Sequence, residues 1–281
     1  MATLEITTRI GCKNNCSYCP QDALVKAYKA RSNVFEMSVD LFKRCIDKVP
    51  TSVRIDFSGM AEPWLNSECT KMVLYAHNKG FDLAVYTTLV GMELLDIELI
   101  RNIPFRIFEV HLPDSDSMTN IKVNDAYLEK LKKVGESGIS GLAYMTIGKL
   151  HPIVKGVVGD IVSEHGVIDR AGNLSDFHGI VHQKRLTGLI RCKSCGNALN
   201  HNVLLPNGDV ILCCMDYGMG HVLGNLATMD YGDLFASDDH RLLQKHLDDD
   251  SLDIICRYCH NARKSKWNLI PGTRILRQIR A

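Results

Sequence analysis

The first 180 residues alternate between two hydrophobic periods. Segments with the 3.6-residue period of an amphipathic helix separate short runs of apolar and β-branched residues. Strands that alternate with helices in this way are typical of βα units and a parallel sheet. The fold class that we expect is α/β, with a partial (β/α)6 barrel of the TIM type over residues 1–184. The short runs predict six strands, at residues 4–9, 53–57, 83–87, 107–112, 142–147 and 167–170.

Three of the intervening segments have recognisable helix boundaries. Residues 37–49 place their apolar side chains on one face, and Ser38 stands at the N-cap position. Residues 70–79 end at Gly80, and residues 124–134 end just before another glycine. Glycine is common after the last turn of a helix because it tolerates a left-handed backbone. We therefore expect helices that close βα units.

The loops that follow the predicted strands carry the distinctive residues of this half. In a parallel barrel, functional side chains gather where the βα loops converge, at the carboxyl ends of the strands. We expect all of these loops on one rim. They are the loop with Cys12, Cys16 and Cys19 after strand one, residues 58–63 after strand two, 87–89 after strand three, 111–114 after strand four and 170–173 after strand six.

From about residue 185 the pattern changes to short strand signals among glycine, cysteine and asparagine. The turn Pro206-Asn207-Gly208-Asp209 between residues 202–205 and 210–212 predicts a hairpin. A helix is predicted at residues 231–247, and residues 263–280 have an amphipathic pattern. We expect a second, small α+β domain over residues 185–281, which bears cysteines and ends in a helical segment.

Composition narrows the class of protein. A chain of 281 residues with 46% hydrophobic and 23% charged residues can bury a large core. Its 33 Lys and Arg residues against 32 Asp and Glu residues leave a net charge of +1, which offers no basic footprint for nucleic acid. There is no run of 18 apolar residues and no signal-peptide pattern. We expect a cytoplasmic protein without a membrane or nucleic-acid partner.

Eleven cysteines in a reducing compartment point to metal ligands or small buried side chains rather than disulfides. Cys12, Cys16 and Cys19 are spaced by three and then two residues. A four-iron cluster takes one cysteine per iron, so three cysteines leave one iron open. The spacing therefore favours an iron–sulfur cluster that binds a small molecule.

This CxxxCxxC pattern, with the aromatic Tyr18 before the last cysteine, resembles the signature of the radical S-adenosylmethionine (SAM) enzymes. The resemblance implies that Cys12, Cys16 and Cys19 hold a [4Fe–4S] cluster and that SAM chelates its fourth iron. In that family the reduced cluster cleaves SAM to methionine and a 5′-deoxyadenosyl radical. An electron donor such as flavodoxin or ferredoxin is implied as a partner.

The loop Ser58-Gly59-Met60-Ala61-Glu62-Pro63 is similar to the GxxEP form of a SAM-binding motif of this family. The resemblance implies that Gly59, Met60 and Glu62 meet the SAM amino group; glycine allows close approach, and a carboxylate suits an ammonium. Tyr18 and Thr88 are implied as further cofactor-binding residues. His111 is a candidate catalytic residue, with a satisfied structural histidine as the alternative.

The C-terminal half resembles the SPASM and twitch extensions of the family, which hold auxiliary clusters. No cysteine follows the last pair, which favours the twitch arrangement with one auxiliary [4Fe–4S] cluster. Cys192 and Cys214 stay unassigned, since either could replace its neighbour as a ligand. Cys214 could instead be a buried thiol or a hydrogen donor. The implied ligands are Cys195, Cys213, Cys256 and Cys259.

The nearest functional resemblance is to 2-deoxy-scyllo-inosamine dehydrogenases, which oxidise a secondary alcohol of an aminocyclitol. Arg170-Ala171-Gly172 is similar to their Arg-Gly-Gly, so Arg170 is a candidate for orienting a substrate hydroxyl or carboxylate, with an ion-paired structural role as the alternative. The resemblance implies an oxidoreductase that takes a hydrogen atom from a sugar, aminocyclitol or nucleoside alcohol and passes an electron to the auxiliary cluster. The sequence does not identify the base that such a reaction needs.

Two other hypotheses stay open. One is a radical SAM enzyme that modifies a peptide, or an epimerase in which Cys214 returns a hydrogen atom. The other is a non-catalytic binding protein in which Cys192-x-x-Cys195 and Cys256-x-x-Cys259 bind zinc. The zinc hypothesis leaves the Cys12 loop and the GxxEP loop without a role. We expect a small-molecule substrate.

Overall fold

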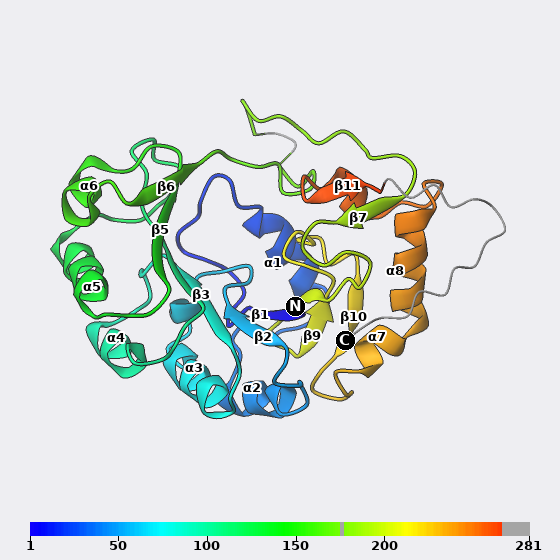
Figure 1. Ribbon diagram of the computed structural model, residues 1–281, viewed down its shortest axis with the longest axis horizontal. Helices are drawn as coiled ribbons and strands as arrows, with labels where there is room; N and C mark the ends of the chain where they lie inside the picture. Colours follow the sequence, from blue (N-terminus) through cyan, green and yellow to red (C-terminus); the bar gives the residue numbers. More distant parts are fainter. Residues whose placement is uncertain (175–176, 266–281) are drawn as a thin grey trace.

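A computed structural model describes residues 1–174 and 177–265 of the chain. A nine-stranded sheet in the order β10-β9-β8-β1-β2-β3-β4-β5-β6 forms its centre. Figure 1 shows the sheet curving so that its strands line the inside and helices α2 to α6 cover the outside. None of the described helices is both long enough and apolar enough to cross a membrane.

The barrel half consists of six parallel strands, each paired with the next. The α/β class and the partial barrel are therefore confirmed. The strands are β1 (Thr3–Ile6), β2 (Arg54–Phe57), β3 (Leu83–Thr87), β4 (Ile107–His111), β5 (Leu142–Ile147) and β6 (Val162–His165). The helices are α1 (Gln21–Lys29), α2 (Val39–Ile46), the 3-10 turn η1 (Pro63–Leu65), α3 (Cys69–Asn78), α4 (Leu94–Ile100), α5 (Asp125–Glu136) and α6 (Pro152–Val158).

Helix α2 shows how local sequence sets these elements. The Ser38 hydroxyl accepts a hydrogen bond from the backbone N–H of Leu41 at 3.2 Å and so caps the first turn. The apolar face of the helix packs against the sheet and buries Phe42 and Ile46 completely. Each such side chain contributes about 1.5–3 kcal/mol by leaving water.

The sixth strand is shifted from its predicted place. Residues 167–170 are irregular, and the strand lies just before them, at β6. This strand is at the edge of the sheet and its side chains are mostly exposed, so it lacks the apolar pattern that identifies a buried strand. The prediction followed the apolar residues at 167–168, but Ile168 packs against residues of the C-terminal half and not within the sheet.

The C-terminal half adds three strands to the same sheet. The predicted hairpin is confirmed, with Gly208 in its turn at φ +91°. The predicted helix over residues 231–247 is broken at Ser237, whose hydroxyl caps α8 by accepting from the His240 N–H at 3.1 Å. The elements are β7 (Ile190–Cys192), β8 (His201–Leu204), β9 (Asp209–Ile211), β10 (Val222–Asn225), α7 (Asp233–Ala236), α8 (Asp238–Asp248), the 3-10 turn η2 (Ile255–Tyr258) and β11 (Ala262–Lys264).

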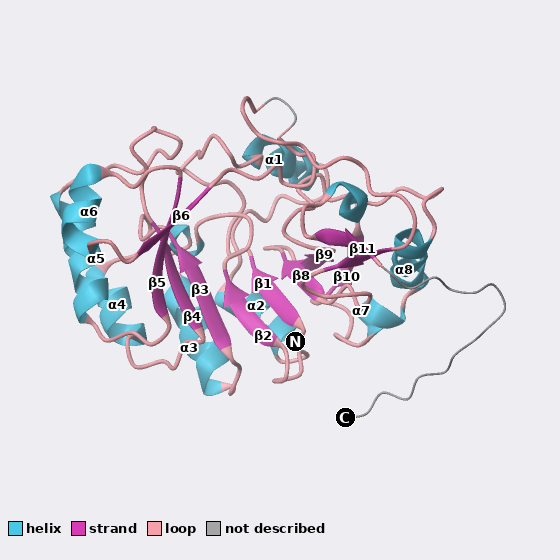
Figure 2. Ribbon diagram, turned by 45° about the horizontal axis from the view of Figure 1, so that its top comes forward, coloured by secondary structure: helices cyan, strands magenta, loops and turns pink. Residues whose placement is uncertain are grey.

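Strand β8 pairs in parallel with β1, opposite the side on which β2 pairs. The sheet therefore continues past the predicted domain boundary at residue 184, which falls in the irregular segment between β6 and β7. Figure 2 shows β8 to β10 beside β1, with α8 on the far side of the C-terminal half. The predicted C-terminal helical segment lies largely at residues 266–281, outside the described residues.

Candidate active site

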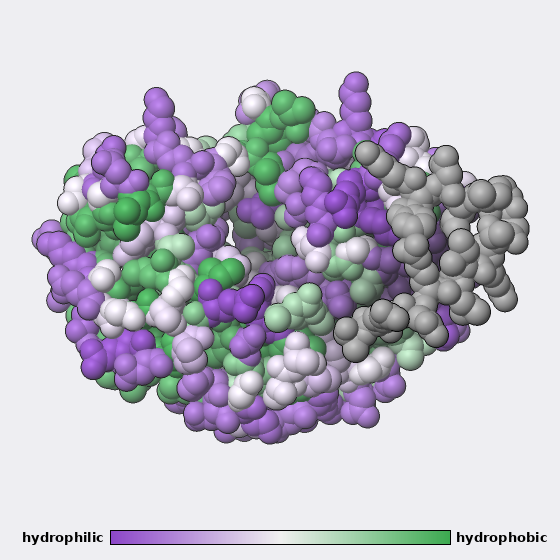
Figure 3. Space-filling model, viewed as in Figure 1, coloured by the Kyte–Doolittle hydropathy of each residue, from purple (hydrophilic) through white to green (hydrophobic). Residues whose placement is uncertain are grey.

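A cavity of about 770 Å³ lies inside the curve of the sheet, between the loops of the barrel and the C-terminal half. Figure 3 shows the molecule hollowed near its centre at this place. Every candidate residue predicted for catalysis or SAM contact lines this one cavity. They are Cys12, Cys16, Tyr18, Cys19, Gly59, Met60, Glu62, Thr88, His111, Arg170 and Cys214.

The loop between β1 and α1 turns three thiols toward the cavity. Its turns are closed by hydrogen bonds from Asn15 N to the Cys12 carbonyl, at 3.4 Å, and from Cys19 N to the Cys16 carbonyl, at 3.0 Å. Burial raises the pKa of Cys16 to about 12, and the charges of Cys19 and Cys12 add to the rise. Three neighbouring thiolates without a metal would repel one another, so the thiols stay protonated. A bound metal deprotonates them because its positive charge stabilises the thiolates. The donor set fits an iron–sulfur cluster.

Glu62 is one of the buried carboxylates of the cavity, with 4% of its surface exposed. It accepts hydrogen bonds from the Thr87 hydroxyl at 2.7 Å, from the Thr88 N–H at 2.6 Å and hydroxyl at 2.7 Å, and from Trp64 N at 3.3 Å. All of these donors are neutral, so the negative charge is held in place but not cancelled. Asn14 donates to the Thr88 hydroxyl at 2.8 Å and joins this network to the cysteine loop.

Gly59 brings the second loop against β1. Its φ is +68°, and a Cβ there would stand 2.3 Å from the Thr7 hydroxyl. The same hydroxyl accepts from the Met60 N–H at 3.2 Å, and the Met60 carbonyl accepts from the Gln21 side chain. A glycine is needed because the loop backbone touches the strand directly.

Arg170 begins three consecutive residues with a left-handed backbone, at φ +49°, +57° and +85°. The buried Asp169 supports them by accepting from the Ala171 N–H at 3.1 Å. Among residues 1–174 and 177–265, the Arg170 guanidinium makes neither an ion pair nor a hydrogen bond. Burial alone would lower its pKa, but the neighbouring Tyr217, Cys19 and Cys214 raise it. The cation lines the cavity, near Cys19 of the cysteine loop and Cys214 of the C-terminal half.

The C-terminal half gathers five cysteines rather than the predicted four. Burial raises the pKa of Cys213, and the charges of Cys256 and Cys259 add to it. Cys195 lowers the pKa of Cys192, and burial followed by the charge of Cys192 raises the pKa of Cys256. Cys192 therefore lies in this group, which agrees with the alternative that it replaces a neighbouring cysteine as a ligand. Cys214 packs beside Cys259 as well, but it also lines the cavity, where it lowers the pKa of Glu5.

In the described structure, the five cysteines are not arranged to bind a single metal ion. In the parts of the chain that the structure describes, no three or more His, Cys, Asp or Glu side chains are arranged to hold one metal ion. A [4Fe–4S] cluster instead takes its four thiolates on four separate irons, which spreads the ligands apart.

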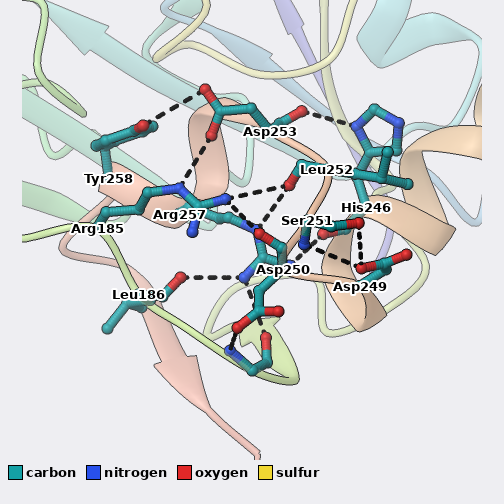
Figure 4. A network of polar contacts seen from close by, with 11 residues as sticks. Arg185, Leu186, His246, Asp249, Asp250, Ser251, Leu252, Asp253, Arg257 and Tyr258 are labelled. Atoms are coloured by element: carbon teal, nitrogen blue, oxygen red, sulfur yellow. Dashed lines mark hydrogen bonds and ion pairs between the residues drawn. The ribbon is translucent and has the colours of Figure 1, made fainter.

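Arg257 braces the segment that carries two of these cysteines. It is fully buried and donates to the carbonyl oxygens of four residues on three neighbouring segments. Figure 4 shows this network beside the ion pair of Arg185 with Asp253, whose N···O distance is 3.4 Å. One acceptor lies in the last turn of α8, where the helix dipole favours a cation. The carbonyls belong to Leu186, Gly188, His246 and Leu252, at 2.6–3.1 Å.

The cavity floor holds polar residues that the sequence interpretation missed. Strands β1, β2, β3, β4 and β8 send polar side chains inward, and several are paired. Arg54 and Asp56 form two hydrogen bonds of 2.6 and 2.7 Å, and His111 contacts Glu109 at 3.2 Å. The signal was polar residues at every second position of strands that otherwise read as buried. The missed residues are Glu5, Arg54, Asp56, Tyr86, Glu109 and His201.

Tyr217 was also missed, because nothing in its local sequence indicates a role. Its hydroxyl lies 3.8 Å from the Cys19 sulfur, although the two residues are almost 200 positions apart. The Gln21 amide donates to the same sulfur at 3.5 Å. The C-terminal half thus supplies a direct neighbour to the cysteine loop.

Comparison with known proteins identifies one domain and a fold. Residues 192–260 match the SPASM family, described as an iron–sulfur cluster-binding domain. No curated protein sequence matches the chain. The predicted cluster-binding region is therefore confirmed at the level of its family.

Several solved structures share the fold along nearly the whole chain. BtrN in complex with AdoMet and 2-DOIA is 15% identical, with a TM-score of 0.61, and the alignment covers 94% of this chain and 93% of that one. anSMEcpe with bound AdoMet is 13% identical, with a TM-score of 0.58, over 92% and 86% of the two chains. Streptococcus suis SuiB bound to the precursor peptide SuiA is 13% identical, with a TM-score of 0.59, over 84% and 65%. At these identities the similarity establishes the fold.

Proposed function

We propose that this chain, which has the fold of the radical SAM enzymes and carries a SPASM domain, is a radical SAM oxidoreductase that oxidises an alcohol of a small molecule. The observation that carries the proposal is the shared cavity. Three thiols, a buried carboxylate and a guanidinium converge there from loops far apart in the sequence.

The cofactors supply the radical, and the chain supplies their surroundings. When bound, a [4Fe–4S] cluster on Cys12, Cys16 and Cys19 with SAM at its open iron supplies a 5′-deoxyadenosyl radical that removes a hydrogen atom from a C–H bond. Glu62 offers a buried, uncancelled negative charge to the SAM ammonium. Thr88 fixes that carboxylate, and Gly59 lets the loop backbone pack directly against Thr7.

Oxidation of an alcohol to a ketone removes a hydrogen atom, a proton and an electron. An auxiliary iron–sulfur cluster held by the SPASM cysteines is a suitable acceptor for the electron. Arg170 lines the cavity near Cys19 and Cys214 and donates from a forked guanidinium, which suits holding a substrate oxygen there. The proton requires a group of the protein.

The charges of the cavity favour a hydroxylated amine as substrate. Four carboxylates line it against two arginines: Glu5, Asp56, Glu62 and Glu109, with Arg54 and Arg170. A volume of about 770 Å³ is within the usual range for small-molecule sites. Sugars, aminocyclitols and nucleosides fit this polarity, and BtrN holds 2-DOIA in a similar fold.

Epimerisation or peptide modification is the second candidate function. Cys214 lines the cavity with a thiol that could return a hydrogen atom to a substrate radical. Structures of the same fold hold peptides, as in anSMEcpe with the Cp18Cys peptide. Deuterium from solvent would enter a carbon of the product in epimerisation, whereas oxidation leaves a ketone without it.

Anaerobic turnover tests the proposal. Purified protein with SAM and dithionite, or with reduced flavodoxin, should form 5′-deoxyadenosine, and about eight irons per chain should be present if two clusters are bound. 2-Deoxy-scyllo-inosamine, nucleotide sugars and peptides are the substrates to screen. Zinc in place of iron would overturn the proposal in favour of a binding protein.

Two cysteine variants separate the roles of the two halves. Cys16→Ala should abolish SAM cleavage because it removes a ligand of the SAM-binding cluster. Cys256→Ala should retain some cleavage and lose product, since only the electron acceptor is removed. Equal loss of cleavage in both variants would contradict an electron-accepting role for the C-terminal half.

A further inference from the structure

A carboxylate and a histidine form a buried pair in the cavity floor. Glu5 lies on β1, and His201 begins β8, where it is paired with Thr3. The two side chains are therefore diagonal neighbours on the inner face of the sheet. His201 Nε2 lies 3.1 Å from Glu5 Oε1, and both residues line the cavity.

Further contacts hold the Glu5 carboxylate. The Ser58 hydroxyl donates to its second oxygen at 3.0 Å, and the nearby Cys214 helps to lower its pKa. Only 6% of Glu5 is exposed. Because Ser58 holds one oxygen and His201 the other, the carboxylate is fixed in place and in turn fixes the orientation of the imidazole.

The surrounding charges favour an ionised carboxylate next to the ring. Burial alone would raise the pKa of Glu5, but His201, Cys214 and Ser58 outweigh it and the pKa is lowered. Burial alone would lower the pKa of His201, but Glu5 and then Asp56 outweigh it, against Arg54, and the pKa is raised. Asp56, Arg54 and Cys214 are the other ionisable groups that act on the pair.

The geometry sets the tautomer of the neutral ring. With Nε2–H donating to Glu5, the lone pair of His201 is on Nδ1, which has no hydrogen-bond partner among residues 1–174 and 177–265. This is the arrangement in which a carboxylate orients a histidine and stabilises its cation after it takes a proton. His201 lines the cavity with 29% of its side chain exposed, and Nδ1 is not among the buried polar atoms of the described residues, so it can be reached from solvent.

We propose that His201 is the general base that accepts the proton of the substrate hydroxyl, with Glu5 as the positioning residue that fixes the ring. The proposal rests on the proposed alcohol oxidation. The substrate O–H bond breaks and an N–H bond forms at Nδ1. The same carbinol loses a hydrogen atom to the SAM-derived radical and an electron to the auxiliary iron–sulfur cluster, which leaves a ketone.

His111 is the competing base in the cavity, since it contacts Glu109 in a similar way. That carboxylate side chain is 29% exposed, compared with 8% for Glu5, so water screens it more strongly. The experiment therefore includes both histidines. His77 on α3 lies away from the cavity and provides a matched control.

The first test compares coupling in His201→Gln, His111→Gln and His77→Gln, with 2-deoxy-scyllo-inosamine as probe. Glutamine preserves the donor to Glu5 but cannot take a proton. His201→Gln should still form 5′-deoxyadenosine while ketone formation falls roughly 100-fold, the usual effect of losing a general base. Wild-type ketone yield in His201→Gln, or the loss appearing in His111→Gln alone, would overturn the proposal.

The second test uses pH. A raised pKa keeps His201 protonated to higher pH, so ketone formation should rise with pH through that pKa as the free base appears. In Glu5→Gln the interaction that raises the pKa is lost, so the rise should move to lower pH. An unmoved profile in Glu5→Gln would contradict the assignment.

A third measurement does not depend on turnover. Histidine deuterium exchange followed by mass spectrometry reports the pKa of each ring in the intact holoenzyme. The pKa of His201 should fall in Glu5→Gln and stay unchanged in His77→Gln. If the wild type makes no 5′-deoxyadenosine, the proposed function is wrong. If it makes 5′-deoxyadenosine but the pKa of His201 is equal in wild type and Glu5→Gln, only the proposed role of the Glu5–His201 pair is wrong.

Discussion

At the scale of single residues, the cavity is defined by side chains that hold others in place. Glu62 is fixed by Thr87 and Thr88, and Glu5 is fixed by Ser58 and His201. Tyr217 acts on the cysteine loop itself, because its hydroxyl contacts the Cys19 sulfur. These hydrogen bonds position charged groups of the cavity and contribute little to the apolar surface that folding buries.

Tyr217→Phe should lower the reduction potential of the SAM-binding cluster. A hydrogen bond to a ligand sulfur stabilises the more negative, reduced cluster, so its loss makes reduction harder. An EPR-monitored redox titration of the holoenzyme measures this. Tyr231→Phe is the control, since Tyr231 is also buried and its hydroxyl has no partner in the described structure. Equal potentials in wild type and Tyr217→Phe would show that the contact has no such effect.

At the scale of elements, the sequence predicted most strands well. Strands β1 to β5 were found because apolar runs between glycines and polar turns are a local signal. The exposed edge strand β6 was misplaced, and α1, α4 and α6 were missed together with β7, β10 and β11. Short elements with few buried residues give little periodicity, and their pairing partners are distant in the chain.

Gly59→Ala tests how closely the loop after β2 must approach β1. The new Cβ would meet the Thr7 hydroxyl at 2.3 Å and its backbone at 3.0 Å, so the loop has to move. We expect weaker SAM binding in equilibrium dialysis with the reconstituted protein. Gly80→Ala, at φ +83° with open space around it, shares only the backbone strain of about 1–2 kcal/mol. Equal SAM affinity in the two variants would contradict the role of this close approach.

At the scale of the whole molecule, one sheet joins the two halves. The pairing of β1 with β8 places the C-terminal half against the cavity, and Arg257 braces the segment with Cys256 and Cys259. The two halves therefore contribute to one site, although the SPASM match covers residues 192–260 alone.

Arg257→Met should destabilise the C-terminal half. Four buried carbonyl groups lose their donor, which costs roughly 3–5 kcal/mol in the free energy of unfolding. Urea unfolding measures the loss, and iron analysis should show fewer irons per chain. Arg263→Met on β11, an exposed position, is expected to change neither. A wild-type unfolding midpoint in Arg257→Met would rule out this bracing role.

The sequence by itself determined the features that neighbouring residues encode. Cysteine spacing, the GxxEP loop and the hairpin turn each lie within a few positions, so their local geometry follows from the residues present. Their common rim followed from the rule that parallel strands end at one edge.

Only the tertiary structure decided which distant residues meet. His201 lies beside Glu5 because β8 pairs with β1, Tyr217 reaches Cys19 across almost 200 residues, and Cys192 joins the other C-terminal cysteines. Periodicity reports which side of an element is buried but not what it is buried against. Partner choice depends on the packing of the whole chain, and that packing put a base candidate where the sequence had indicated none.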